Sequence, residues 1–125
     1  MNLRSFIFLL CLCPSLAHAL EMVCDIQSAG KKFTLHTTPQ ADPYQLDSID
    51  LPGYFRMSIQ YLTSRNVFKT YVYHDGKERY VLIHASESVL PPAHCSRYQD
   101  GLGLQRVYSH SMERELSFQC RSRCS

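Results

Sequence analysis

The sequence predicts an all-β fold: a small antiparallel β-sandwich, or a partly open barrel, of about seven short strands. Apolar and polar residues alternate with a period of two over much of the chain after residue 20, while a helical period is nearly absent. Turn-forming residues separate these alternating segments. Four cysteines in what we expect to be an exported chain add two disulfide staples.

The first nineteen residues predict a cleavable secretion signal. One basic residue, Arg4, precedes the apolar run 6–12, and Ala17-His18-Ala19 forms a signal-peptidase site. The apolar run is far shorter than the about 20 residues that a membrane-spanning helix needs, and no later segment approaches that length. We therefore expect a periplasmic or secreted protein without a membrane span, whose single β-rich domain covers residues 20–125.

Removal of the signal also changes the number of cysteines in the mature chain. Two of the six cysteines lie in the signal, which leaves Cys24, Cys95, Cys120 and Cys124. An even number in an exported chain predicts two structural disulfides, for which three pairings are possible. We expect Cys24 to bond within the C-terminal region, because that bridge closes a loop of nearly the whole domain and contributes about 4–5 kcal/mol in the chain-entropy model.

Three consecutive strands are expected in the middle of the chain, at residues 54–63, 67–74 and 78–86. Asp75-Gly76 predicts a two-residue hairpin turn between the last two strands, because both residues tolerate positive φ. In the resulting register Val72 lies opposite Arg79, and Tyr71 lies opposite Tyr80. This register places the apolar residues of all three strands on one face.

Hairpins at the two ends of the mature chain complete the predicted fold. The first covers residues 22–37 with its turn at 28–31, and the last covers residues 104–120, with Val107, Leu116 and Phe118 facing the core. Residues 39–52 are expected to be a connector. Residues 88–103 are expected to be a long irregular loop, of a length at which loops are often functional.

Tyrosines dominate the polar face of the predicted middle strands. A tyrosine combines a rigid apolar ring with a polar tip, which suits a protein–protein contact. The 88–103 loop, held rigid by a disulfide at Cys95, would offer a second contact surface. The ordinary alternatives are a solvated sheet face, where β-propensity alone favours tyrosine, and a loop that only connects strands. The predicted partner-binding residues are Arg56, Lys69, Tyr71, Tyr73, Tyr80 and His84 on the strands, and His94, Arg97 and Tyr98 on the loop.

Charge and motif content exclude several function classes. The chain has 13 Lys and Arg against 11 Asp and Glu, and removal of the signal takes Arg4 away. This balance argues against nucleic acid, which needs a basic excess gathered on one face. No serine-hydrolase, zinc-protease or phosphate-loop motif occurs, so we predict no catalytic residue and no cofactor.

The leading hypothesis is a non-enzymatic binding protein that contacts a protein partner in the cell envelope, as an inhibitor, an immunity protein or an accessory subunit of an envelope machine. A metal-binding or redox accessory protein is the alternative from a different class, because thiolates, imidazoles and thioethers bind soft metal ions. Its ligands would come from His94, Cys95, His110, Met112, Cys120 and Cys124. An unrecognised small hydrolase is a less favoured alternative.

Overall fold

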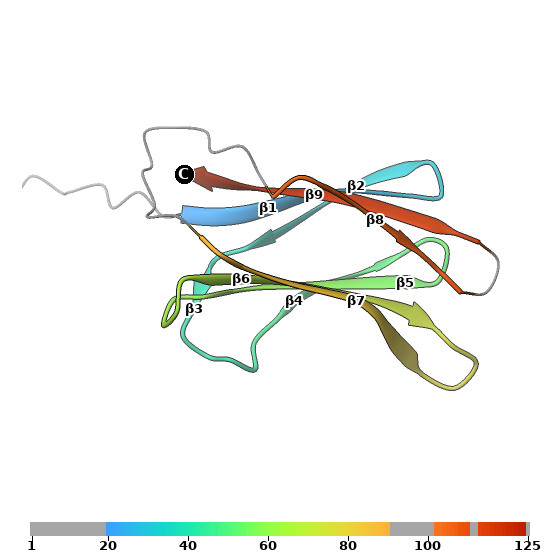
Figure 1. The fold of residues 1–125 in the computed structure, drawn as a ribbon, viewed down its shortest axis with the longest axis horizontal. Coiled ribbons are helices and arrows are strands. Elements are labelled where there is room, and N and C mark those ends of the chain that lie inside the picture. Colours follow the sequence, from blue (N-terminus) through green and yellow to red (C-terminus); the bar gives the residue numbers. More distant parts are fainter. Residues whose placement is uncertain (1–19, 91–101, 111–112, 125) are drawn as a thin grey trace, which may run out of the picture.

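The computed structural model describes residues 20–90, 102–110 and 113–124, and all regular structure in these ranges is β-strand (Figure 1). Two sheets lie face to face, which makes the fold a sandwich rather than a barrel. Within the described ranges no helix is present that could cross a membrane. The strands are β1 (Leu20–Ser28), β2 (Lys31–Thr37), β3 (Pro39–Gln40), β4 (Asp47–Leu51), β5 (Phe55–Leu62), β6 (Val67–Asp75), β7 (Tyr80–Val89), β8 (Leu104–Tyr108) and β9 (Glu115–Cys124).

The prediction of an all-β fold is confirmed, but the expected strand number was too low. Sheet A has the strand order β2-β1-β9-β8, and sheet B has the order β3-β5-β6-β7 with β4 also paired to β5. The two additional strands, β3 and β4, lie in the segment 39–52 that the sequence predicted to be a connector. Both pair with β5, β4 in the antiparallel and β3 in the parallel sense.

Sheet A joins the two ends of the mature chain. The β1–β2 hairpin turns at Ala29 and Gly30, whose φ angles are 51° and 72°, as a turn between twisted strands requires. This is the turn that the sequence predicted. β9 runs antiparallel to β1, so the first and last strands lie side by side in the middle of the sheet (Figure 1).

A disulfide links these two central strands. Cys24 and Cys120 are directly opposite each other, their Cα atoms are 4.0 Å apart, and the Sγ atoms are bonded across a sequence separation of 96 residues. Both residues are buried. The expectation that Cys24 bonds within the C-terminal region is confirmed. Cys95 and the side chain of Cys124, which the second predicted disulfide would use, lie outside the described residues.

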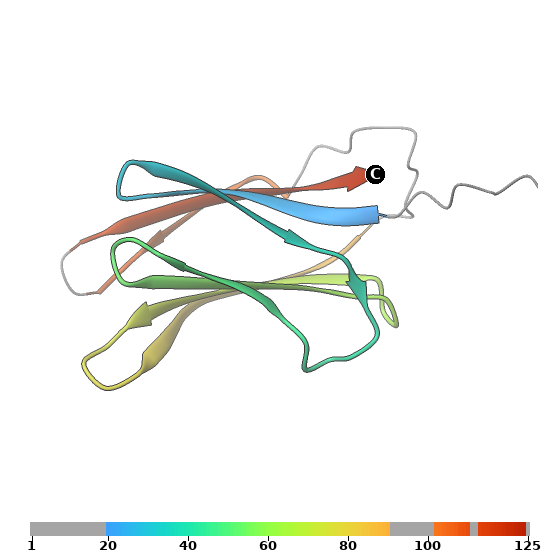
Figure 2. The ribbon, with the colours of Figure 1, turned by 180° about the vertical axis from the view of Figure 1, so that it is seen from behind.

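The core fills the space between the sheets. The inward faces that the sequence predicted for the strands beginning at residues 54, 104 and 113 are confirmed, since none of the residues concerned is more than 6% exposed. The twist of the two layers is visible from behind in Figure 2. The buried residues that the sequence placed on the inward faces of these three strands are Phe55, Met57, Ile59, Tyr61, Val107, Leu116 and Phe118.

The β6–β7 hairpin differs from the prediction. Its turn spans Gly76–Arg79 and is closed by a hydrogen bond from the Gly76 N–H to the Arg79 carbonyl (2.9 Å). Asp75 then pairs with Tyr80, so the predicted pairs Tyr71–Tyr80 and Val72–Arg79 are wrong. A two-residue turn would have pointed Arg79 toward the core, and burying that charge without a partner is costly. The longer turn leaves Arg79 exposed.

A β-bulge shifts the register once more within β7. The register changes between Val72 and Tyr73, so Val72 pairs with His84 while Tyr73 pairs with Leu82. Such a bulge inserts an extra residue and reverses the inside–outside alternation beyond it. The imidazole of His84 therefore faces the interior, where it meets the Phe118 ring edge to face at 5.9 Å. The prediction of His84 on the outer, partner-binding face is wrong.

Candidate functional site

The outer face of sheet B carries five of the side chains predicted to bind a partner. Arg56 on β5 lies directly opposite Tyr73 on β6, and Tyr80 lies at the start of β7. Tyr71 follows two residues before Tyr73 on the same face, in the middle of the sheet. These four side chains are half-buried rather than fully exposed, so each contacts its neighbours. The fifth side chain on this face is Lys69.

Arg56 is the centre of this group. Its Nε donates to Asp50 Oδ1 at 2.6 Å and its Nη2 to Oδ2 at 3.4 Å, across the pair that joins β4 to β5. Its guanidinium lies 4.0 Å from the centre of the Tyr80 ring. The hydrogen bond lowers the pKa of Asp50 and raises that of Arg56, so both groups are charged over the physiological pH range. Asp50 and Tyr80 thus fix one arginine in one orientation.

The other end of this face is covered. Gln60 is only 2% exposed, because its amide Nε2 donates to the backbone carbonyls of Pro43 (2.9 Å) and Gln45 (3.0 Å) in the β3–β4 connection. Lys69 is directly opposite Gln60 and so lies at this covered end, apart from Arg56. The β3–β4 connection and the β6–β7 hairpin both project from the outer side of sheet B (Figures 1 and 2). The face is thus covered at its Gln60 end, and its Arg56 end lies beside the β6–β7 hairpin.

A second arginine–tyrosine pair lies at the same end of the molecule. The guanidinium of Arg114 lies 5.0 Å from the centre of the Tyr54 ring, and Tyr54 is 58% exposed. The Tyr54 carbonyl accepts the Asp75 N–H at 2.7 Å, which places this pair against the end of the β6–β7 hairpin. Sequence reasoning missed both residues. The dipeptide Pro52-Gly53 before Tyr54 is a turn signal that would have drawn attention to the position.

The backbone of Tyr54 is strained. Its φ is +64°, a left-handed conformation that is unusual for a bulky residue, and it follows Gly53 at +88°. Such a conformation costs about 1–3 kcal/mol and occurs most often at functional sites. The Tyr54 ring is largely exposed, so core packing does not offset that cost. The turn therefore holds the Tyr54 ring in solvent, with the Arg114 guanidinium stacked on it.

We call the combined feature the arginine–tyrosine surface: Tyr54, Arg56, Tyr73, Tyr80 and Arg114. Leu82, on β7 opposite Tyr73, adds an apolar side chain that is 48% exposed. Rings, guanidinium groups and one leucine thus gather at the hairpin end of sheet B. Tyrosine and arginine, although not leucine, are enriched among the energetically dominant residues of protein interfaces.

The other residues that the sequence predicted to bind a partner or a metal ion lie mostly outside the described residues. His94, Arg97 and Tyr98 lie outside the described residues, as do Cys95 and Met112. Cys120 is bonded to Cys24, so it offers no thiolate to a metal ion. Over the ranges that the structure describes, no three His, Cys, Asp or Glu side chains are placed to hold a metal ion.

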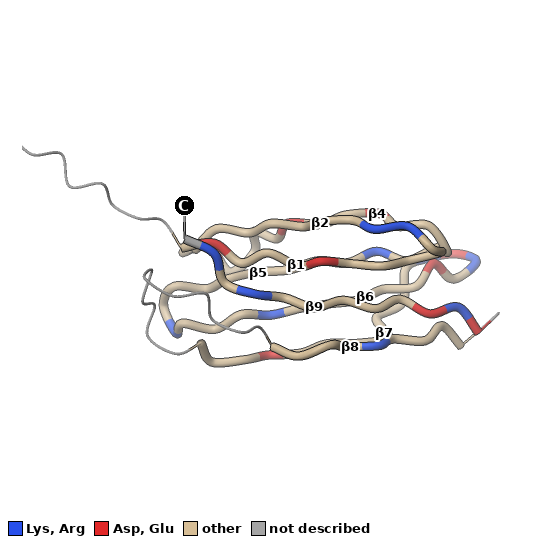
Figure 3. The backbone as a smooth tube through the Cα atoms, turned by 90° about the horizontal axis from the view of Figure 1, so that it is seen from above, with Lys and Arg blue, Asp and Glu red and all other residues tan. Residues whose placement is uncertain are grey.

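Opposite charges are interspersed over the domain (Figure 3). The basic residues of β9 are paired rather than free: Arg121 contacts Asp25, and Arg123 contacts Glu21, both on the neighbouring strand β1. The basic C-terminal segment is therefore held by ion pairs to β1. In the described ranges it does not present a cationic face of the kind that binds a phosphate backbone.

Comparisons of the chain with protein-family models, with curated proteins and with solved structures give no match. Among the described residues, the arginine–tyrosine surface combines an exposed ring, an oriented guanidinium and backbone strain in one place.

Proposed function

We propose that this chain is an exported, non-enzymatic binding protein that engages a protein partner of the cell envelope through the arginine–tyrosine surface. The observation that supports this proposal is the presence of two arginine–tyrosine stacks at one end of the molecule, one of them on a strained turn. Tyrosine and arginine are enriched among the residues whose truncation costs most binding energy in protein interfaces.

The local chemistry favours a protein over other partners. The stacked guanidinium of Arg56 is already oriented by Asp50 and Tyr80, so binding would cost little side-chain entropy. The surface mixes apolar ring faces with polar tips and both signs of charge, as interfaces with a hydrophobic centre and a polar rim do. An inhibitor, an immunity protein and an accessory subunit of an envelope machine would all use such a surface.

Export is part of the same proposal. Cleavage after Ala19 would leave intact every strand that the structure describes, since the first of them, β1, covers Leu20–Ser28. The Cys24–Cys120 disulfide is consistent with an oxidising compartment. We propose a periplasmic or secreted location, a single domain over residues 20–125, and a second disulfide between the two remaining cysteines, Cys95 and Cys124.

Thiol titration tests the disulfide set. The mature protein, purified without reductant and unfolded in guanidinium, should show no free thiol, and a proteolytic digest should contain a peptide pair joined through Cys95 and Cys124. Addition of reductant before titration is the positive control and should release all four thiols. Two free thiols on Cys95 and Cys124 would contradict the second disulfide while leaving Cys24–Cys120 untouched.

Partner capture tests the surface. Mature protein immobilised on beads should retain an envelope protein, and the affinity for that protein, once purified, should fall by about 30-fold or more in Tyr80→Ser, the loss expected for an interface residue that contributes about 2 kcal/mol. Tyr54→Asn should weaken binding in the same direction. Tyr44→Ser is the control, because Tyr44 is 91% exposed but lies in the β3–β4 connection, at the covered end of the face and apart from Arg56.

The identity of the retained protein decides between the possible roles. If it is an enzyme whose activity falls when the wild-type protein is added, and falls less with Tyr80→Ser, the role is inhibition or immunity. A non-enzymatic subunit of an envelope assembly indicates an accessory role. Equal affinity of the wild type, Tyr80→Ser and Tyr54→Asn would contradict the arginine–tyrosine surface as the binding site.

A further inference from the structure

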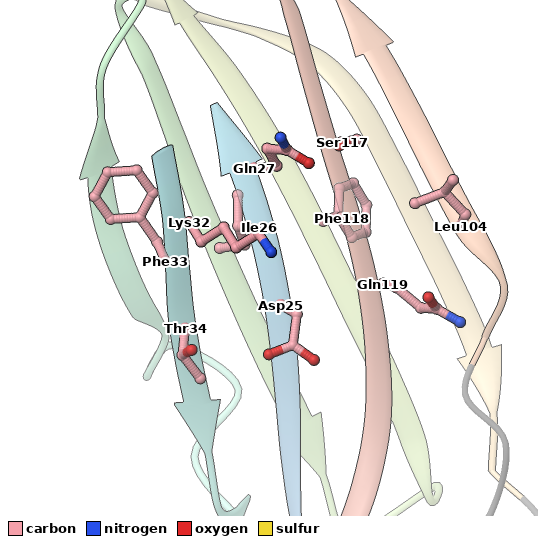
Figure 4. Close-up of a pocket in the computed structure, with 10 residues that line it drawn as sticks. All are labelled: Asp25, Ile26, Gln27, Lys32, Phe33, Thr34, Leu104, Ser117, Phe118 and Gln119. Atoms are coloured by element: carbon pink, nitrogen blue, oxygen red, sulfur yellow. The ribbon is translucent and has the colours of Figure 1, made fainter. Parts of the chain in front are cut away.

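A groove crosses the outer face of sheet A, on the opposite side of the sandwich from the arginine–tyrosine surface (Figure 4). Its volume is about 450 Å³. The floor is formed where Phe33, Ile26 and Phe118 lie directly opposite one another on β2, β1 and β9. Ile26 and Phe118 are buried toward the core, so mainly their backbone faces the groove.

The sheet register builds two walls of side chains along this floor. One wall consists of Thr34, Asp25 and Gln119, which are mutually opposite on neighbouring strands, and the other of Lys32, Gln27 and Ser117. Leu104 of β8 closes one end, and a second hollow of about 400 Å³ continues past Gln27 and Ser117 toward Arg106. The space between the two walls therefore runs across the strands, and the second hollow extends it along β1 and β9.

The wall side chains are rich in unused hydrogen-bonding groups. Within the described ranges, Gln27, Lys32, Thr34, Ser117 and Gln119 form no side-chain hydrogen bond and no ion pair with another residue of the chain, and Asp25 is paired with Arg121. Four of these five unpaired side chains are uncharged amides or hydroxyls, each of which both donates and accepts hydrogen bonds. Figure 4 shows them rising from three neighbouring strands around one space.

This lining selects among ligand classes. An anionic chain would meet a single unpaired cation, Lys32, in a lining that also contains the carboxylate of Asp25. An apolar ligand or a protein interface would find Leu104 as the one exposed large apolar side chain of the lining, with no exposed aromatic anchor. A neutral ligand with many hydroxyl groups matches the amides and hydroxyls best. Neighbouring strands are about 4.8 Å apart, close to the length of one sugar unit in a linear glycan.

We propose that this groove binds a neutral, linear oligosaccharide, with successive sugar units lying over β2, β1 and β9. The amides of Gln27 and Gln119, on opposite walls, hold the hydroxyl groups of the central unit. The site is independent of the protein-binding surface on sheet B. Because the groove is open to solvent and offers few contacts, we expect a dissociation constant of about 1 mM.

Nuclear magnetic resonance titration of the ¹⁵N-labelled mature protein tests the proposal. The probes are maltohexaose, cellohexaose and fully N-acetylated chitohexaose, with a heparin-derived hexasaccharide as the anionic comparison, each added to about 10 mM, a concentration that would nearly saturate a site of about 1 mM affinity. We expect at least one neutral probe to shift the backbone amide signals of residues 25–27, 32–34 and 117–119. Absence of shifts with all three neutral probes would overturn the proposal, as would binding of the anionic probe alone.

Substitutions on the two walls separate a specific site from general surface contact. Gln27→Ala and Gln119→Ala should each weaken binding of the shifting probe by about fivefold or more, because each removes about 1 kcal/mol of hydrogen bonding. Gln45→Ala, at an exposed glutamine in the β3–β4 connection, is the matched control and should bind as the wild type does. Equal weakening in all three variants, or none in Gln27→Ala and Gln119→Ala, would also overturn the proposal.

Discussion

Replacement of both Cys24 and Cys120 by alanine should lower the free energy of unfolding by about 4–5 kcal/mol under oxidising conditions. The bridge spans 96 residues of sequence, so its loss frees almost the whole unfolded chain. A domain of this size typically has only about 5–15 kcal/mol of stability in total. The double variant should therefore be marginally folded, although both cysteines are buried and alanine fits the space they leave.

Urea unfolding followed by circular dichroism measures this loss. The matched control is the double substitution of Cys95 and Cys124, whose proposed bridge would close a much shorter loop and should cost about 1 kcal/mol less. Reduction of the wild-type protein breaks both bridges and should therefore lower its stability more than either double substitution does. If the free energy of unfolding of the Cys24 and Cys120 double variant falls by less than about 1 kcal/mol, the Cys24–Cys120 disulfide is not a major source of stability.

Phe55→Ala should cost about 3–5 kcal/mol. Phe55 is 1% exposed, it begins β5, and its ring meets the His74 imidazole edge to face at 5.3 Å. Truncation opens a cavity that the paired strands β4, β5 and β6 have little freedom to fill, because their backbones are fixed by the sheet hydrogen bonds. Thermal or urea unfolding of the variant gives the loss directly.

The neighbouring aromatic residue provides the comparison. Tyr54→Asn should change the free energy of unfolding by less than about 1 kcal/mol, because asparagine tolerates the left-handed backbone at +64° and this gain offsets the lost contact with Arg114. Two adjacent aromatic side chains thus have opposite roles, one in the core and one in binding. A loss of more than about 2 kcal/mol in Tyr54→Asn would mean that Tyr54 is structural, which would remove the argument from backbone strain.

Local patterns explain which parts of the fold could be predicted. The alternation in β5 and β6 identifies their buried faces, and the Ala29-Gly30 turn fixes the β1–β2 register, because a short turn and its strands are specified by adjacent residues. The β6–β7 register could not be predicted in the same way. Asp75-Gly76 resembles a two-residue turn, but exclusion of Arg79 from the core and the bulge at Val72 and Tyr73 depend on the packed sandwich.

The candidate sites likewise contain residues that local sequence patterns group together and residues that only long-range packing brings together. Arg56, Tyr73 and Tyr80 share one face of neighbouring strands, so strand alternation was enough to group them. Arg114 stacks on Tyr54 from a connection 60 positions later in the chain, and no local pattern reports that contact. The groove of sheet A also depends on β9 lying beside β1, which is a long-range pairing.

Site-specific photo-crosslinking tests the binding proposal most directly. A benzophenone amino acid placed at Tyr73, at the centre of the arginine–tyrosine surface, should form a covalent adduct with the partner when the exported protein is irradiated in intact cells. The same amino acid at Leu104, at the far end of β8 on sheet A, should form none, although that position is 55% exposed. An adduct at position 104 without one at position 73 would contradict the assignment of the binding surface to sheet B.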